Sequence, residues 1–255
     1  RVFSEASDGG DRATLFAETS ATAQRGRHTW VAGFAFQRDR YSGRDSGAFD
    51  FSFSTPSVFA QDEIRLSPRL TLAASARLDD HSAYGALVSP RVSVLARPGE
   101  PWTLRASLGE GAYSPTPFNE ETEETGLSRL KPITGLRGER ARGGALDATF
   151  HRGPLEISGT FFASRVRSPV LLRTLGPATV ALENGTEPTR THGTEFIARY
   201  RLEGLLVMAT HAWTSSTELD PDTRRRREVP LTPRHTASLN VVGQRERLGG
   251  AGLEE

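Results

Sequence analysis

The sequence contains no cysteine, so neither a disulfide framework nor a thiolate metal site can form. This absence suits an oxidising compartment and a reducing one equally well. No window approaches the roughly 20 consecutive apolar residues that a transmembrane helix needs. That absence excludes a helical membrane protein but leaves a membrane β-barrel open. Lys131 is the only lysine and the net charge is +1, so a general attraction to nucleic acid is not expected.

Recognisable catalytic arrangements are also missing. The six histidines are dispersed, and the sequence has no H-x-x-x-H pair, no G-x-S-x-G and no phosphate-binding loop. We therefore predict no enzyme activity, no catalytic residue and no cofactor. Asp79, Asp80 and His81 stand together and could be offered as metal ligands, but a solvated loop explains them better, so no metal site is predicted.

What the sequence does have is strict alternation of apolar and polar residues. Leu70, Leu72 and Leu78 fall on one face of an extended segment, while Arg77 and Asp79 fall on the other. The same period recurs over residues 102–108 and 194–202, and the charged residues of the second face imply water there. We predict antiparallel strands at 12–23, 28–40, 55–66, 70–80, 86–97, 102–113, 140–151, 155–172, 180–201, 205–217 and 232–243, with another starting at Leu248.

The connections between these strands alternate in length. Short turns rich in Gly, Pro or charge are predicted at 24–27, 66–69, 97–101, 151–154 and 201–204, and longer polar loops at 41–54, 80–86, 113–140, 173–179 and 218–231. Long strands with short turns on one side and long loops on the other are typical of outer-membrane barrels. A soluble all-β surface or adhesion protein is the alternative, and it would bury Leu70, Leu72 and Leu78 in a dry core.

Several short segments resemble motifs of the barrel of TonB-dependent outer-membrane receptors, and they occur in that family's order. They are FAQDE at 59–63 with LSPRLTL at 66–72, SPRVS at 89–93, GEGAYSPT at 109–116, ENG at 183–185 with THGTE at 191–195, and PLTPRH at 230–235. The sequence departs from the family pattern at Ser114, where the family has Arg, and at Ile133, where an L-K-P motif usually continues with Glu.

The resemblance implies an antiparallel transmembrane β-barrel in the outer membrane of a Gram-negative bacterium. Residues 1–255 would supply roughly 11–12 strands, about half of a barrel of about 22 strands, without the plug domain or the C-terminal strands. The implied function is active uptake of a scarce nutrient such as a ferric siderophore or cobalamin, and the alternative is a passive porin-like channel. The implied partners are the TonB-ExbB-ExbD system through the missing plug, a small-molecule chelate, and outer-membrane lipid with lipopolysaccharide. No nucleic acid is expected.

Two groups of candidate site residues follow from this layout. The first would bind ligand from the outer loops: Tyr113, Glu120, Glu121, Arg129, Arg137 and Arg140. The second would line the lumen or face the plug: Arg77, Arg105, Glu195, Arg199 and Arg201. The run Arg224 to Arg227 could contact lipopolysaccharide phosphates through bidentate guanidinium bonds, and a solvated loop tip explains it equally well.

Overall fold

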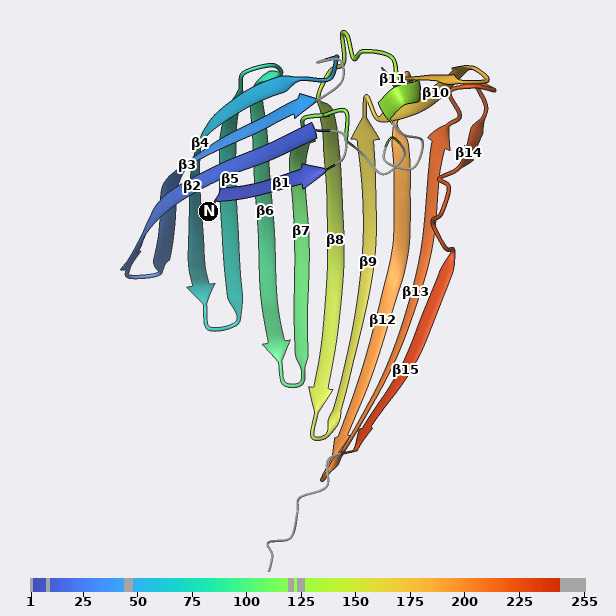
Figure 1. Cartoon of the computed structure of the whole chain (residues 1–255). Coiled ribbons are helices and arrows are strands. Elements are labelled where there is room, and N and C mark those ends of the chain that lie inside the picture. Colours follow the sequence, from blue (N-terminus) through green and yellow to red (C-terminus); the bar gives the residue numbers. More distant parts are fainter. Residues whose placement is uncertain (1, 8–9, 44–47, 119–121, 123–126, 244–255) are drawn as a thin grey trace, which may run out of the picture.

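The computed structural model describes residues 2–7, 10–43, 48–118, 122 and 127–243, and nearly all of them lie in antiparallel strands or the turns between them (Figure 1). The strands are β1 (Val2–Ser7), β2 (Gly10–Arg25), β3 (His28–Gly43), β4 (Phe51–Ser67), β5 (Leu70–His81), β6 (Gly85–Gly99), β7 (Trp102–Tyr113), β8 (Glu139–Arg152), β9 (Leu155–Arg167), β10 (Val170–Gly176), β11 (Thr179–Asn184), β12 (Thr189–Leu202), β13 (Leu205–Leu219), β14 (Arg226–Glu228) and β15 (His235–Gly243). One turn of 3-10 helix, η1, covers Leu127–Arg129. The predicted all-β antiparallel fold is confirmed.

One large sheet carries most of these strands. Its order is β1 to β9, then β12 and β13, and both β14 and β15 pair with β13. Among the described residues no pairing joins β15 to β1 or β2, so the sheet is an open part of a barrel. No helix in the described part of the chain is long and apolar enough to cross a bilayer.

The two ends of the sheet differ in their connections, as the sequence predicted. Two-residue turns join β2 to β3, β4 to β5, β6 to β7, β8 to β9 and β12 to β13, and we call this the turn end. Gly26, Gly153 and Gly204 have positive φ in these turns, which glycine adopts without strain. The long connections gather at the opposite, loop end, which is uppermost in Figure 1.

The loop end also holds the main departures from the predicted strands. The strand predicted over 155–172 ends at Arg167, because Ser168 has a φ of 53° and Pro169 offers no N–H to the ladder. The strand predicted over 180–201 is divided between β11 and β12. Strands β10 and β11 form a separate hairpin, and β14 lies inside a predicted loop. The strand expected from Leu248 lies outside the described residues.

Register places every strand residue of the large sheet on one of two faces. One face exposes large hydrophobic side chains, and we call it the apolar face; its members include Leu78, Val88, Val92, Val94, Trp102, Leu104, Leu108, Leu146, Phe161, Phe196 and Tyr200. Leu108 is 65% exposed and Leu146 59% exposed. A continuous surface of this kind is unstable in water and suits the hydrocarbon of a bilayer. The opposite face, rich in Arg, Glu, Ser and Thr, is called the polar face.

The only cluster of buried apolar residues in the described chain lies away from the middle of the sheet. Leu130, Val180 and Leu182 form it, and partly buried residues of the loop after β7 and of β10 pack around them. The backbone of Lys131 donates to the carbonyl of Val180 at 2.9 Å. This cluster packs the loop after β7 against the β10–β11 hairpin, so these two connections at the loop end form one packed unit.

Candidate functional site on the polar face and its loop end

The five residues predicted to line a lumen all lie on the polar face. Arg77 donates to Asp79 Oδ1 at 2.7 Å and to Ser57 Oγ at 2.9 Å, and its guanidinium lies 5.9 Å from the centre of the Phe59 ring. Arg199 pairs with Glu156 at 3.0 Å. In register, Arg105 stands opposite Asp147, Glu195 opposite Thr160, and Arg201 opposite Leu206.

A polar cavity of about 490 Å³ follows this face across β4, β5, β6 and β7. Gln61, Glu63, Arg91 and Arg105 line it together with small residues such as Ser75. Charged and hydroxyl groups of this density need water or a polar partner to satisfy them. The polar face can therefore line a wet channel or pack against a polar domain.

Aromatic rings gather on the polar face at the loop end. Phe53 and Tyr84 each lie 5.0 Å from the ring of His81, and Tyr41 meets Phe118 edge-on at 4.5 Å. Tyr84 donates to the carbonyl of Pro115 at 2.6 Å, which holds the start of the loop after β7 over the polar face. Burial raises the pKa of Tyr84, with Tyr113 nearby adding to the shift, so this hydroxyl stays protonated at neutral pH.

Sequence reasoning missed this aromatic cluster. It assigned residues 41–54 to a loop, whereas Phe51 and Phe53 lie in β4 and point to one face with stacked rings 4.7 Å apart. The alternation of Phe51 and Phe53 with serine was the available signal. His81, Tyr84 and Phe118 come from two other parts of the chain, and only the fold brings them together.

The predicted ligand-binding residues are not all placed together. Tyr113 ends β7 on the polar face opposite Glu139, while Arg129 donates to the carbonyl of Pro177 at 3.0 Å in the β10–β11 turn. Arg137 is bonded through its backbone to Asn184. The outer-loop position expected for Arg140 is corrected, because it lies in β8 and its register partner Ala112 puts it on the apolar face. Glu120 and Glu121 lie outside the described residues.

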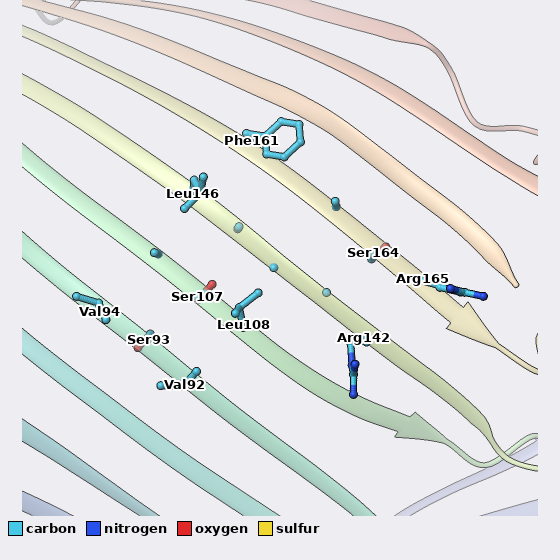
Figure 2. Close-up of a pocket in the computed structure, with 15 residues that line it drawn as sticks. Val92, Ser93, Val94, Ser107, Leu108, Arg142, Leu146, Phe161, Ser164 and Arg165 are labelled. Carbon is cyan, nitrogen blue, oxygen red and sulfur yellow. The ribbon is translucent and has the colours of Figure 1, made fainter.

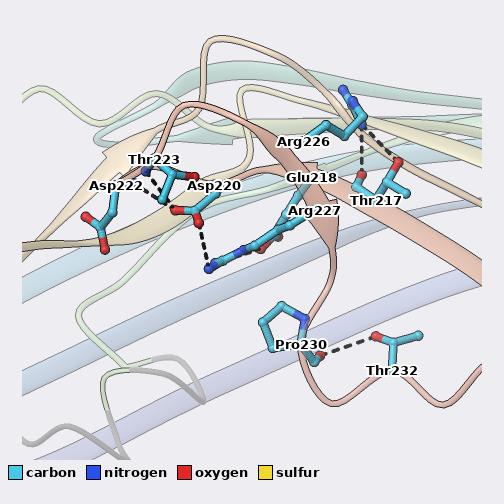
Figure 3. Close-up of polar contacts among 9 residues, drawn as sticks. All are labelled: Thr217, Glu218, Asp220, Asp222, Thr223, Arg226, Arg227, Pro230 and Thr232. Atoms are coloured by element: carbon cyan, nitrogen blue, oxygen red, sulfur yellow. Dashed lines mark hydrogen bonds and ion pairs between the residues drawn. The ribbon is translucent and has the colours of Figure 1, made fainter.

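The arginine run at the tip between β13 and β15 is partly occupied by acidic partners (Figure 3). Arg227 pairs with Glu218 at 2.9 Å and with Asp220 at 3.5 Å. Arg226 pairs with Glu187 at 2.9 Å, which ties this tip to the connection before β12. Backbone N–H groups of Asp222 and Thr223, together with Arg227, lower the pKa of Asp220, so its negative charge is kept for this pairing.

No group of three or more potential metal ligands occurs among the described residues. The run Asp79, Asp80 and His81, which the sequence offered as possible metal ligands, does not bring its side chains together. Asp79 accepts from Ser57 and Arg77 on the polar face, whereas Asp80 pairs in register with Ala86 on the apolar face. His81 Nδ1 accepts from the backbone N–H groups of Ala83 and Tyr84. The two carboxylates therefore point in opposite directions.

Asn184 fastens two of the long loops together, and its removal gives a testable effect. Its amide accepts from Arg137 N at 2.8 Å and donates to the carbonyls of Arg137 and Ser168 at 3.0 Å and 2.9 Å. A net contribution of about 1 kcal/mol per bond predicts that Asn184→Ala speeds amide exchange at residues 130–138 by at least about tenfold. Hydrogen exchange followed by mass spectrometry on the detergent-solubilised protein measures this.

Asn240→Ala is the matched control for that measurement, because Asn240 makes one long bond of 3.4 Å to Ser238 on β15. It should leave exchange at residues 130–138 unchanged. Equal protection in wild type and Asn184→Ala would mean that the packed cluster around Leu130 holds the loops without the amide.

Comparison with known proteins gives one family and a set of similar folds. The family model described as TonB dependent receptor-like, beta-barrel matches residues 2–253. The siderophore receptor PirA from Pseudomonas aeruginosa superposes with a TM-score of 0.68 at 18% identity over 82% of this chain and 42% of that one. The copper transporter OprC gives 0.74 at 18% identity over 93% and 41%, and the FrpB iron transporter from Neisseria meningitidis 0.68 at 15% over 85% and 38%. No curated protein sequence matches the chain.

Proposed function

The chain belongs to the TonB-dependent receptor β-barrel family, and from this we infer that it forms barrel wall and outer loops of a receptor that imports a scarce nutrient across the outer membrane. The family is one of outer-membrane receptors and transporters, not of enzymes, and its location is the outer membrane of Gram-negative bacteria. The chain spans about two fifths of the length of the solved receptors it resembles. The uptake activity, ligand and partners of the whole receptor are therefore proposals.

The family match over residues 2–253 carries this proposal, and the two faces of the sheet support it. An apolar face toward lipid and a polar face toward the interior are what a barrel wall needs. We place the loop end outside the cell, because long loops are extracellular in such barrels and short turns are periplasmic.

In the proposed mechanism the polar face packs against a plug domain through charged contacts. Arg77, Arg105, Glu195, Arg199 and Arg201 are the residues that would meet the plug or the water around it. TonB, with ExbB and ExbD, would pull on the plug at the expense of the proton gradient and so release bound ligand inward. The barrel then supplies fixed walls, and the energy comes from the partner complex.

The ligand would be a small metal chelate, such as a ferric siderophore or cobalamin, bound at the loop end. Tyr113 and the aromatic cluster around His81 face the polar side there, and Arg129 and Arg137 stand on the loops above. We retain Glu120 and Glu121 as ligand candidates in the same loop. Aromatic side chains with nearby arginines suit a chelate that combines apolar surface with polar or anionic groups. Arg140 is not retained, since it faces the other way.

Energy dependence tests this function and separates it from a passive channel. Cells that make the complete receptor should take up labelled ferric siderophore or labelled cobalamin, and deletion of tonB or addition of a protonophore should reduce uptake to that of cells without the receptor. A passive channel would lose nothing on either treatment, because diffusion through an open pore needs no proton gradient. The encoding reading frame gives an independent check, since a plug and a TonB box upstream are required.

A further inference from the structure

The apolar face carries an unexpected cluster of arginines at its loop end. Register places Arg140 and Arg142 of β8, Arg165 and Arg167 of β9, and Arg190 of β12 on this face, and all five are exposed. We call this set the arginine cluster. It was not predicted, because alternation assigns a face within one strand, and only the strand registers show that the five arginines of three strands lie side by side.

Within the arginine cluster like charges stand directly opposite one another. Arg140 pairs in register with Arg167, Arg142 with Arg165, and Arg165 also with Arg190. Directly opposed like charges destabilise a sheet. Glu110, which pairs with Arg142, is the one carboxylate that the registers place among them in the described strands. Among the described residues, the other four arginines have no carboxylate within ion-pair distance, although they stand beside an apolar surface.

Directly below the arginine cluster, the apolar face is hollowed (Figure 2). A groove of about 610 Å³ runs along β6 to β9, with Arg142 and Arg165 at its loop-end rim and Leu108, Leu146 and Phe161 along it. Gly144 lets the Leu108 side chain lie across β8, because Leu108 Cδ2 stands 2.5 Å from where a Cβ would be. A second groove of about 640 Å³ continues toward the turn end and shares Leu146 and Phe161.

Resting on the proposed function, which places the loop end outside the cell, we propose that the arginine cluster and these grooves bind a phosphorylated glycolipid of the outer leaflet, the lipid A part of lipopolysaccharide. The cluster spans three strands, or about 10 Å, which suits the separated phosphates of a disaccharide headgroup better than a single phosphodiester. Guanidinium groups bind phosphate oxygens in a bidentate manner, and the opposed arginines lose their repulsion when an anion lies between them. The grooves below receive acyl chains, which run along the strands toward the membrane centre.

This site differs from the exposed arginine run at residues 224–227. There Arg226 and Arg227, which lie in β14, are bonded to carboxylates of the chain itself, and neither residue lines the two grooves described above. In the arginine cluster both parts of an amphipathic lipid are matched, the phosphates by charge and the acyl chains by shape. A lipid held here would fix the height of β8, β9 and β12 in the membrane.

Lipid binding by the complete, detergent-solubilised receptor tests the proposal. Thermal unfolding is followed by tryptophan fluorescence as lipid A, dephosphorylated lipid A or phosphatidylglycerol is titrated. We expect lipid A to raise the Tm of the wild type, and the double variant Arg165→Gln with Arg167→Gln to bind it at least tenfold more weakly. Without lipid that variant should unfold at the same Tm as wild type or higher, because repulsion within the cluster is relieved.

Arg91→Gln is the matched control, since Arg91 lies on the polar face of β6 and should leave the lipid A response intact. Arg190→Gln alone gives a second, milder variant, for which weaker lipid A binding is also expected. The proposal is overturned if the double variant or Arg190→Gln binds lipid A as tightly as wild type. It is equally overturned if dephosphorylated lipid A or phosphatidylglycerol binds as well as lipid A does.

Discussion

Replacing Leu146 with arginine is expected to lower the free energy of folding into a bilayer by about 2–4 kcal/mol, whereas the same change at the neighbouring Ala145 should be tolerated. Leu146 lies at the middle of β8 on the apolar face and is 59% exposed, with Phe161 and Ala106 as its register partners. Arginine on the lipid face costs about 2–4 kcal/mol at the bilayer midplane. Its neighbours on this face, Ala106, Leu108 and Phe161, offer no side-chain acceptor to a guanidinium.

Ala145 provides the matched control because it is one residue away on the same strand and faces Ser107 on the polar side. Folding of the complete receptor into lipid vesicles, measured as a function of urea, should show a reduced folding free energy for Leu146→Arg and little change for Ala145→Arg. If both variants fold equally well, the apolar face does not contact lipid, and the soluble alternative with a dry core returns.

The alternation that supports this prediction was readable from the sequence because lipid and water impose opposite demands on successive residues. Leu70, Leu72 and Leu78 alternate with Arg77 and Asp79, and the structure puts the two sets on opposite faces. The turn positions were equally readable, since Gly153 and Gly204 mark turns that need positive φ. Local chemistry decides both features, so no knowledge of distant segments is required.

The loop end could not be read in the same way. Residues 170–172 continue a strand-like pattern after Pro169, and they do form a strand, but it pairs with β11 in a separate hairpin. A period of two shows that a segment is extended and does not show which strand lies beside it. The same limitation hid the aromatic cluster, in which Phe53, His81 and Tyr84 are brought together by pairing at a distance in sequence.

The alternation of residues along a strand assigns a face to Arg140 as well as to the predicted lumen residues. Arg77, Arg199 and Arg201 lie within segments whose alternation assigns a face, and all three lie on the polar face. Arg140 was grouped with the loop before it by charge alone. Counting from the apolar Leu146 in steps of two reaches Arg140, so its position on the apolar face follows from the same rule.

Gly193→Ala is expected to destabilise the folded receptor by about 1–3 kcal/mol, although alanine is normally as good as or better than glycine in a strand. Gly193 is buried on the polar face of β12, where a Cβ would collide with the carbonyl oxygen of Trp213 and lie 2.7 Å from Cζ of Phe162. The backbone oxygen cannot rotate away, so β12 and β13 would have to separate locally. The Phe162 ring of β9 covers the glycine in the way that Phe59 of β4 covers Gly33 of β3.

Gly159→Ala isolates this effect, because Gly159 lies in the adjacent strand β9 with nothing within 4 Å of an added Cβ. It should be neutral or stabilise by up to about 1 kcal/mol through the unfolded chain. Urea unfolding of both variants in detergent micelles compares them directly. If Gly193→Ala is as stable as Gly159→Ala, close packing does not require glycine at position 193. A contact with the plug or the ligand would then be the reason for glycine there.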